Sequence, residues 1–383
     1  MATHLKYFVT HRDSFFIGLV FTCNSLLFGS WITRIPNIKD AIRLSEAELG
    51  LALLGAPIGS LLIMPLSGWI ISKLEVGKTT LLSGLLHTFS LVLISIANSF
   101  WTFTFALVYY GFINALMNIS MNAAVASIEK SMKKPIMSTC HGMWSIGAML
   151  GSMAGSLTLG LELGTSSHLI GAGLAVALLL LGLSGTLFRL KESKNVEDKV
   201  FALPKGGLLL LAVLAFCILL SEGAIADWSA IYMRDIIRSD PYLVGFAYAG
   251  FALLMAVGRL SGDALIPILG KKKLVFYGGL VSTFGLLLAI LSHSAVLAIL
   301  GFSLTGIGFS CIVPVLFISA ANEPGYSSGT GIAAVTTLGT AGFLVGPPMI
   351  GILAEWYGLN WGLVFVLFCS LLVSVMSLRV KFR

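Results

Sequence analysis

Charged side chains are scarce in this sequence of 383 residues. Only 11% of the residues are Asp, Glu, Lys or Arg, whereas 57% are hydrophobic. A soluble domain carries roughly one quarter charged residues. The shortage argues against an ordinary soluble globular protein and, with the long apolar segments, indicates a protein of the lipid bilayer.

Clustered cysteines and catalytic patterns are missing as well. The five cysteines lie singly in apolar segments without a CxxC pair, which argues against disulfides. The sequence has no His-x-x-x-His pair, and its glycine-rich SGTGIA segment at 328–333 follows no strand and reads better as a helix start. We therefore expect no enzyme, no catalytic residues and no cofactor.

Apolar runs long enough to cross a bilayer, about 20 residues each, occur twelve times. The predicted fold is an all-α membrane protein with these spans at roughly 14–36, 47–72, 79–99, 101–128, 136–161, 167–188, 206–233, 242–267, 274–292, 294–320, 328–357 and 360–378.

The longest charged run, 189–205, separates two halves that carry the same landmarks. We expect an N-terminal six-helix bundle at 1–188, a cytoplasmic linker at 189–205 and a C-terminal six-helix bundle at 206–383. Internal duplication of this kind is common among transporters. Three landmarks recur in chain order at nearly one separation: Leu66-Ser67-Gly68 with Leu260-Ser261-Gly262, Gly111 with Gly306, and Gly147-x-x-x-Gly151 with Gly342-x-x-x-Gly346.

Positive charge is unevenly distributed between the two sides of the predicted membrane. Most of the 24 lysines and arginines fall on the termini, the linker and the loops of the same side. This asymmetry predicts a multi-pass protein with both termini in the cytoplasm, and it explains the net charge of +7 without a nucleic-acid partner. Arg34 is one of the few on the other side, and we expect it to snorkel to the outer surface.

Three amide side chains recur at helical spacing in the fourth span. Asn114, Asn118 and Asn122 are four residues apart and share one helical face. An amide facing lipid is costly, so these side chains point into the bundle, either to bond neighbouring helices or to line a solute pathway. We include all three among the solute-binding candidates.

Other polar and aromatic residues inside the spans complete the predicted solute site. Amides hydrogen-bond hydroxyls, and aromatic faces cover apolar patches of a solute. The further candidates are Asn24, Trp31, His141, Trp144, Ser145, Trp228, Ser310 and Thr337.

Two carboxylates lie within the seventh span. Glu222 is roughly 24 Å along the helix from Gly206 at about 1.5 Å per residue, past the middle of a hydrocarbon core of about 30 Å. Buried ionisable groups of membrane proteins mark functional sites, so Glu222 and Asp227 are the candidates for proton coupling. Asp227 lies nearer the outer end, where pairing with Arg234 is the alternative.

The eighth span ends in a charged pair. Arg259 and Asp263 are four residues apart and can pair along the helix. We expect the two residues to act as a gate, with a purely structural clasp as the alternative.

Several motifs give the sequence a family resemblance. GRLSGDAL (258–265), LMNISMNAAV (116–125), MWSIGA (143–148) and SCIVPVLF (310–317) resemble bacterial permeases of the major facilitator superfamily related to its fucose-permease-like branch. The resemblance implies two pseudo-symmetric six-helix bundles, the bacterial inner membrane and a monomer. That branch uses carboxylates in its first and fourth helices, where this sequence has Ile32 and Asn118, so we expect any proton coupling in the seventh span instead.

The predicted function is secondary active transport by alternating access. We expect proton-coupled uptake of a small polar, neutral or weakly charged, sugar-like solute. Efflux of drugs or metabolites is one alternative. A copper importer is another, because soft thioether ligands select Cu(I) and the fourth and fifth spans contain Met117, Met121, Cys140, His141, Met149 and Met153.

Overall fold

The computed structural model describes residues 8–190 and 204–382, with the side chains of residues 263 and 264 left out. Within this part the chain is helical and falls into two compact units. Unit 1 comprises Met1–Leu44 and Ala52–Asn195, and unit 2 comprises Ser45–Leu51 and Val196–Arg383. The predicted linker lies mostly at 191–203, outside the described residues.

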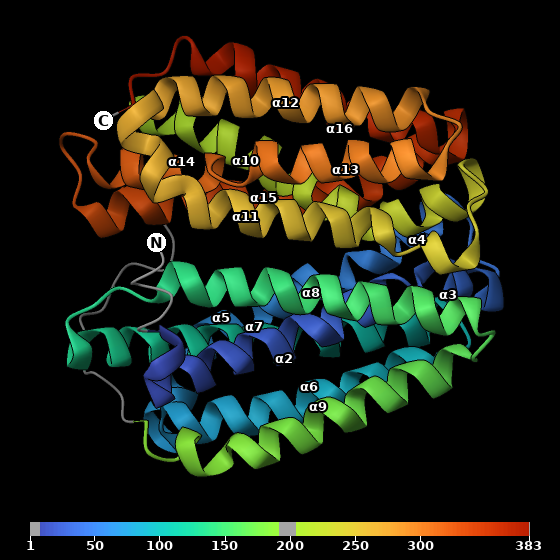
Figure 1. Ribbon diagram of the computed structural model, residues 1–383, viewed down its shortest axis with the longest axis horizontal. Coiled ribbons are helices and arrows are strands. Elements are labelled where there is room, and N and C mark those ends of the chain that lie inside the picture. Colours follow the sequence, from blue (N-terminus) through green and yellow to red (C-terminus); the bar gives the residue numbers. More distant parts are fainter. Residues whose placement is uncertain (1–7, 191–203, 383) are drawn as a thin grey trace. The chain divides into compact units, whose positions relative to one another are not determined.

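Unit 1 contains the helices of the first half (Figure 1). Their bounds are α2 (Arg12–Ile32), α3 (Ile35–Ile42), α5 (Gly55–Leu74), α6 (Val76–Ile96), α7 (Phe100–Met132), α8 (Met137–Gly160) and α9 (Thr165–Leu187).

Unit 2 contains the second half and most of one short helix from the first, whose last two residues, Ala52 and Leu53, belong to unit 1. Its bounds are α4 (Glu46–Leu53), α10 (Gly207–Ile231), the π-helix η1 (Tyr232–Ile236), the 3₁₀ turn η2 (Pro241–Leu243), α11 (Phe246–Leu269), α12 (Lys271–Leu291), α13 (Ala295–Phe309), α14 (Ile312–Ala321), α15 (Ser328–Tyr357) and α16 (Leu359–Ser377).

Eleven helices of the described chain are long and apolar enough to cross a membrane. The twelfth predicted span coincides with α8, whose 24 residues are rich in glycine and serine and so fall outside that set. Three predicted spans are interrupted: α4 and α5 meet at Leu54, η1 continues α10, and α13 and α14 meet at 310–311. The twelve-helix prediction is otherwise confirmed.

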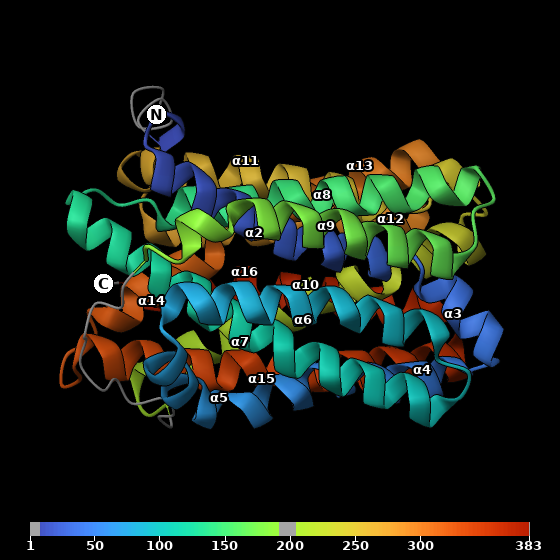
Figure 2. The same cartoon turned by 90° about the horizontal axis from the view of Figure 1, so that it is seen from below.

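The same helix pairs recur in the two units. In unit 1, α2 packs on α8, α7 packs on α5 and α6, and α6 packs on α9 (Figure 1). In unit 2 the corresponding contacts are α10 on α15, α13 on α11 and α12, and α12 on α16, with α11 and α13 neighbours also in Figure 2. The two units are therefore pseudo-symmetric six-helix bundles.

The repeated glycines mark the points where helix backbones touch. A Cβ atom on Gly111 of α7 would lie 1.8 Å from the carbonyl oxygen of Ala56, and one on Gly306 of α13 would lie 2.1 Å from that of Phe251. Gly151 of α8 similarly approaches the carbonyl oxygen of Leu26. Small residues at such crossings let membrane helices pack closely without a hydrophobic driving force.

Segment 45–51 departs from the predicted division into halves, because it packs as part of unit 2. Glu355 Oε2 accepts hydrogen bonds from the backbone N–H groups of Glu46 at 2.9 Å and Ala47 at 3.3 Å. Gly50 lies against Pro347 and Gly351 of α15, where its Cβ would be 2.5 Å from the Pro347 oxygen. A carboxylate at a helix N-terminus satisfies free N–H groups and interacts favourably with the helix dipole.

We expect Gly111→Ala to destabilise unit 1 by about 1–3 kcal/mol, the usual cost of overpacking. The new methyl group must push α7 away from α5. Thermal unfolding of the purified protein measures the effect. Gly182→Ala in α9 is the matched control, since a Cβ there meets nothing within 4 Å; equal midpoints for the two variants would contradict the packing argument.

Candidate functional site

Four predicted solute-binding residues meet in unit 1. Trp144 Nε1 of α8 donates to Asn24 Oδ1 of α2 at 3.0 Å. Asn24 Nδ2 donates to Asn114 Oδ1 of α7 at 2.9 Å, and Asn118 Nδ2 donates to the same oxygen at 3.0 Å. These hydrogen bonds connect α2, α7 and α8, since α2 packs against both other helices. We call the four bonded residues, Asn24, Asn114, Asn118 and Trp144, the amide relay.

Hydrogen bonds within α7 orient the amides of the predicted stripe. Asn118 and Asn122 each donate from Nδ2 to the backbone oxygen four residues earlier, both at 2.9 Å. The three stripe residues Asn114, Asn118 and Asn122, which we call the amide stripe, are half-buried, whereas Asn24 is only 1% exposed. Asn24 is thus buried among the helices, whereas the side chains of the amide stripe are partly exposed.

An aromatic cluster surrounds this relay. The Phe28 ring lies 5.7 Å from the Trp144 ring and 6.5 Å from the Trp31 ring, measured between centroids. Trp31 in turn contacts Tyr110 at 5.5 Å, and Tyr110 contacts His87 at 4.9 Å. Trp31 therefore lies beside the relay, while its indole N–H is buried with no hydrogen-bond partner among the described residues.

His87 was not among the predicted site residues. It is fully buried in α6, and neither ring nitrogen has a hydrogen-bond partner in the described part of the chain. The sequence showed only an isolated histidine in an apolar helix, and nothing in the spacing linked it to Tyr110.

Arg34 corrects the snorkelling prediction. The side chain is 2% exposed, and it donates from Nε to His168 Nδ1 at 3.1 Å and from Nη2 to Thr158 Oγ1 at 2.8 Å. It thereby joins the ends of α2, α8 and α9. Arg34 is the N-cap of the short helix α3, which has Pro36 in its first turn, and its side chain points into unit 1.

The remaining candidates of unit 1 are satisfied locally. Ser145 is buried and donates to the backbone oxygen of His141 at 3.3 Å, while the His141 ring stands edge-on to Phe21 with 5.4 Å between centroids. Serine hydroxyls inside helices commonly bond the preceding turn. Ser145 thus bonds its own helix, and His141 packs on Phe21 of α2.

In unit 2 the relevant contact is an ion pair between α10 and α11. Arg259 Nη2 lies 3.6 Å from Glu222 Oε2, with side-chain exposures of 20% and 16%. Glu222 Oε1 is buried without a hydrogen-bond partner among the described residues. The cation beside Glu222 therefore comes from the neighbouring helix α11 and not from its own helix.

Asp227 does not form the alternative pair with Arg234. Arg234 binds the adjacent Asp235, with Nη2 to Oδ2 at 3.1 Å. Asp227 itself is half-buried on α10, next to Trp228, which is fully buried. The predicted gate partner of Arg259, Asp263, has a side chain outside the described set.

Two hydroxyl candidates of unit 2 bond their own helices. Ser310 Oγ donates to Ile307 O at 2.6 Å, and Thr337 Oγ1 donates to Ala333 O at 2.7 Å. Ser310 also packs against Gly258, where a Cβ would lie 2.1 Å from its Oγ. The position of Ser310 is thus explained by the packing of α11 against the end of α13.

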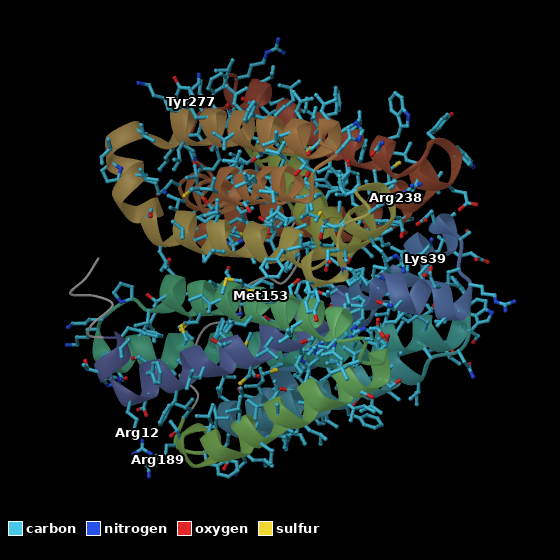
Figure 3. The ribbon with its side chains drawn as sticks, turned by 45° about the vertical axis from the view of Figure 1, so that its right-hand side comes forward. Arg12, Lys39, Met153, Arg189, Arg238 and Tyr277 are labelled. Atoms are coloured by element: carbon cyan, nitrogen blue, oxygen red, sulfur yellow. The ribbon has the colours of Figure 1, made fainter. Side chains whose placement is uncertain are left out.

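The structure describes the surroundings of two methionines in the copper set. Met117 Sδ accepts a hydrogen bond from Asn24 Nδ2 at 3.3 Å, and Met153 lies on an exposed face of α8 (Figure 3). Within residues 8–190 and 204–382, no group of three or more His, Cys, Asp or Glu side chains could hold a metal ion. The thioether of Met117 is thus an acceptor for Asn24 in this structure.

A model of the Major Facilitator Superfamily matches residues 14–340 and, in an overlapping second match, 211–382. The chain belongs to the Major Facilitator Superfamily. It is thus a multi-pass membrane protein of a transporter family.

Curated relatives and solved structures agree with this assignment. An uncharacterised superfamily transporter of Yersinia pestis is 33% identical over 352 residues, covering 92% of this chain and 90% of the relative. Membrane protein MosC of Rhizobium meliloti is 31% identical over 365 residues, covering 94% and 88%.

Two solved structures share the superfamily fold. A bacterial homologue of the human lysosomal transporter Spinster, inward-facing and occupied, aligns with a TM-score of 0.76 at 15% identity over 96% of each chain. The nucleoside transporter NupG aligns at 0.70 and 15% identity over 96% of this chain and 98% of its own.

We expect Arg259→Leu to lower the thermal midpoint of this superfamily member, because it leaves the Glu222 carboxylate in an apolar environment without its cation. Breaking a buried pair typically costs about 3–5 kcal/mol, and removing both partners costs less. The double variant Glu222→Leu with Arg259→Leu should therefore be more stable than Arg259→Leu alone. A double variant less stable than either single one would show that the two side chains do not act as a pair.

Proposed function

We propose that this protein is a secondary active transporter that takes up a small polar, neutral or weakly charged solute together with protons. The amide relay of unit 1 is the observation that carries the proposal. Buried amides are costly in a membrane unless they bond each other or a solute. The relay satisfies the buried Asn24 fully and leaves hydrogen-bonding atoms of the half-buried stripe for a solute.

The proposed proton site is Glu222. A carboxylate and a guanidinium 3.6 Å apart between two apolar helices form a pair whose attraction disappears when the carboxylate is protonated. Coupling requires a group of this kind, which changes charge inside the bundle. In this proposal Arg259 stabilises the ionised Glu222 carboxylate until that carboxylate binds a proton. Arg259 then has a gating role through Glu222, and this role does not depend on Asp263.

The proposed location is the bacterial inner membrane, with a monomer whose two termini face the cytoplasm. In unit 1, Arg12 and Arg189 lie at one end of the bundle and Lys39 lies at the opposite end (Figure 3). The cluster of basic residues on the first side supports a cytoplasmic assignment for that end.

We expect Glu222→Gln to abolish accumulation driven by a pH gradient while sparing exchange of solute between equally loaded sides, because exchange requires no proton release. Proteoliposomes containing the purified chain, loaded with sugars, cyclic polyols, nucleosides or amino acids, provide the measurement. Glu162→Gln is the matched control, since Glu162 is exposed in the loop after α8.

Continued accumulation by Glu222→Gln in a pH gradient would contradict the proposed proton site. The direction is tested separately in intact cells, where uptake predicts accumulation of the solute and efflux predicts its depletion. Copper-dependent growth of a deletion strain would favour the copper alternative.

A further inference from the structure

Two arginines lie among the helices, and their partners differ. Arg259 in unit 2 is paired with the carboxylate of Glu222. Arg34 in unit 1 is only 2% exposed, yet its partners are His168 and Thr158, neither of which carries a negative charge. No Asp or Glu among the described residues forms an ion pair with it. A guanidinium stays protonated in proteins, so Arg34 places a positive charge inside unit 1.

The hydrogen bond from Arg34 determines which ring nitrogen of His168 carries a proton. A guanidinium nitrogen can only donate, so His168 Nδ1, which lies 3.1 Å from Arg34 Nε, is an acceptor. An imidazole that accepts at one ring nitrogen carries its proton on the other. His168 is therefore neutral, with its N–H group at Nε2. That nitrogen is buried and has no hydrogen-bond partner in the part of the chain that the structure describes.

Thr158 holds another edge of the guanidinium. Its Oγ1 accepts from Arg34 Nη2 at 2.8 Å, and its own hydroxyl proton is directed to backbone oxygens of α8, those of Ala154 at 3.0 Å and Gly155 at 2.9 Å. The two bonds to His168 and Thr158 use only some of the N–H groups of the guanidinium. Within the described residues, the hydrogen-bonding groups left over at Arg34 and His168 are therefore all donors.

The neighbouring helix ends compensate the charge of Arg34 only in part. Arg34 follows the C-terminus of α2 at Ile32, and Thr158 lies in the last turn of α8; each of these C-termini carries roughly half a negative charge. His168 lies in the first turn of α9, which begins at Thr165 without a side-chain cap and carries roughly half a positive charge there. About half of the arginine's charge is thus left over, and burying a charge without compensation is costly.

We propose that Arg34 and His168, with Thr158 positioning the guanidinium, bind a small monovalent anion such as chloride between the ends of α2, α8 and α9. The anion accepts hydrogen bonds from the remaining N–H groups of Arg34 and from Nε2–H of His168. A water molecule at this place would bring donors of its own and leave the charge uncompensated.

The burial of the site restricts which anion it accepts. Arg34 and His168 are 2% and 6% exposed, so a single small ion suits the site better than a phosphate or the carboxylate of a large solute. The bound anion connects three helices of unit 1, and we therefore expect it to stabilise the folded chain. The site uses none of the residues of the amide relay, so it does not depend on the proposed solute.

The first experiment follows the thermal midpoint of the purified full chain in sodium chloride, with sodium gluconate replacing chloride at constant ionic strength. Gluconate is too bulky for a site that is almost closed to solvent. We expect the midpoint to rise with chloride, by roughly 2 °C for each tenfold increase above the dissociation constant. A midpoint that is independent of chloride would overturn the inference.

A pair of charge-removing variants tests whether Arg34 is responsible. Arg34→Gln should abolish the chloride dependence. Arg43→Gln is the matched control, because Arg43 is exposed at the end of α3 in the same unit and its replacement changes the net charge equally. We expect this control to keep the full dependence. A chloride response that persists in Arg34→Gln, or one that is lost in both variants, would contradict the assignment.

The donor of His168 is tested by His168→Phe, which keeps a planar ring and loses the N–H group. The chloride concentration that gives half of the stabilisation should rise about tenfold, the equivalent of one lost hydrogen bond. An unchanged concentration would show that His168 does not contact the anion.

A crystallographic measurement on the unsubstituted chain keeps the test decisive if Arg34→Gln does not fold. Crystals grown in sodium bromide should show an anomalous difference peak within hydrogen-bonding distance of the Arg34 guanidinium and His168 Nε2. A water molecule at this position, with no anomalous signal, would overturn the inference.

Discussion

The hydrogen bond from Trp144 to Asn24 is the interaction on which the polar interior of unit 1 depends. Lipid supplies no hydrogen-bond partners, so polar side chains within a bundle must satisfy one another. One donor-only indole on α8 fixes a buried amide on α2, and that amide donates to Asn114 on α7. The amides of Asn118 and Asn122 also bond backbone oxygens of α7. Three helices that cross the membrane separately thereby present one ordered set of donors and acceptors.

The two units share a scaffold but differ in chemistry. Gly111 and Gly306 make equivalent backbone contacts, so the duplicated helices pack in the same way in each unit. Their polar interiors differ: unit 1 contains the uncharged amide relay, and unit 2 contains the Glu222–Arg259 ion pair. In the proposed mechanism this difference separates solute recognition from proton coupling, while the common packing lets each unit behave as a stable body.

The sequence predicted features that are repeated within a single helix and missed those that depend on neighbouring helices. The spacing of Asn114 and Asn118 placed both amides on one face, and the glycine repeats located the helix crossings. Periodicity along α7 could not show that Asn24 and Trp144 hold this face, nor that the cation beside Glu222 is Arg259. Burial of Arg34 was missed because it depends on Thr158 and His168 from two other helices.

Solute protection of a cysteine placed at residue 118 tests the central claim, that the amide stripe binds the transported solute, most directly. The five native cysteines are buried, so Asn118→Cys offers a distinct target for a small polar thiol reagent. We predict that the reagent labels this cysteine and that a transported solute slows the labelling in proportion to its occupancy. Labelling that is unaffected by saturating solute would contradict the account.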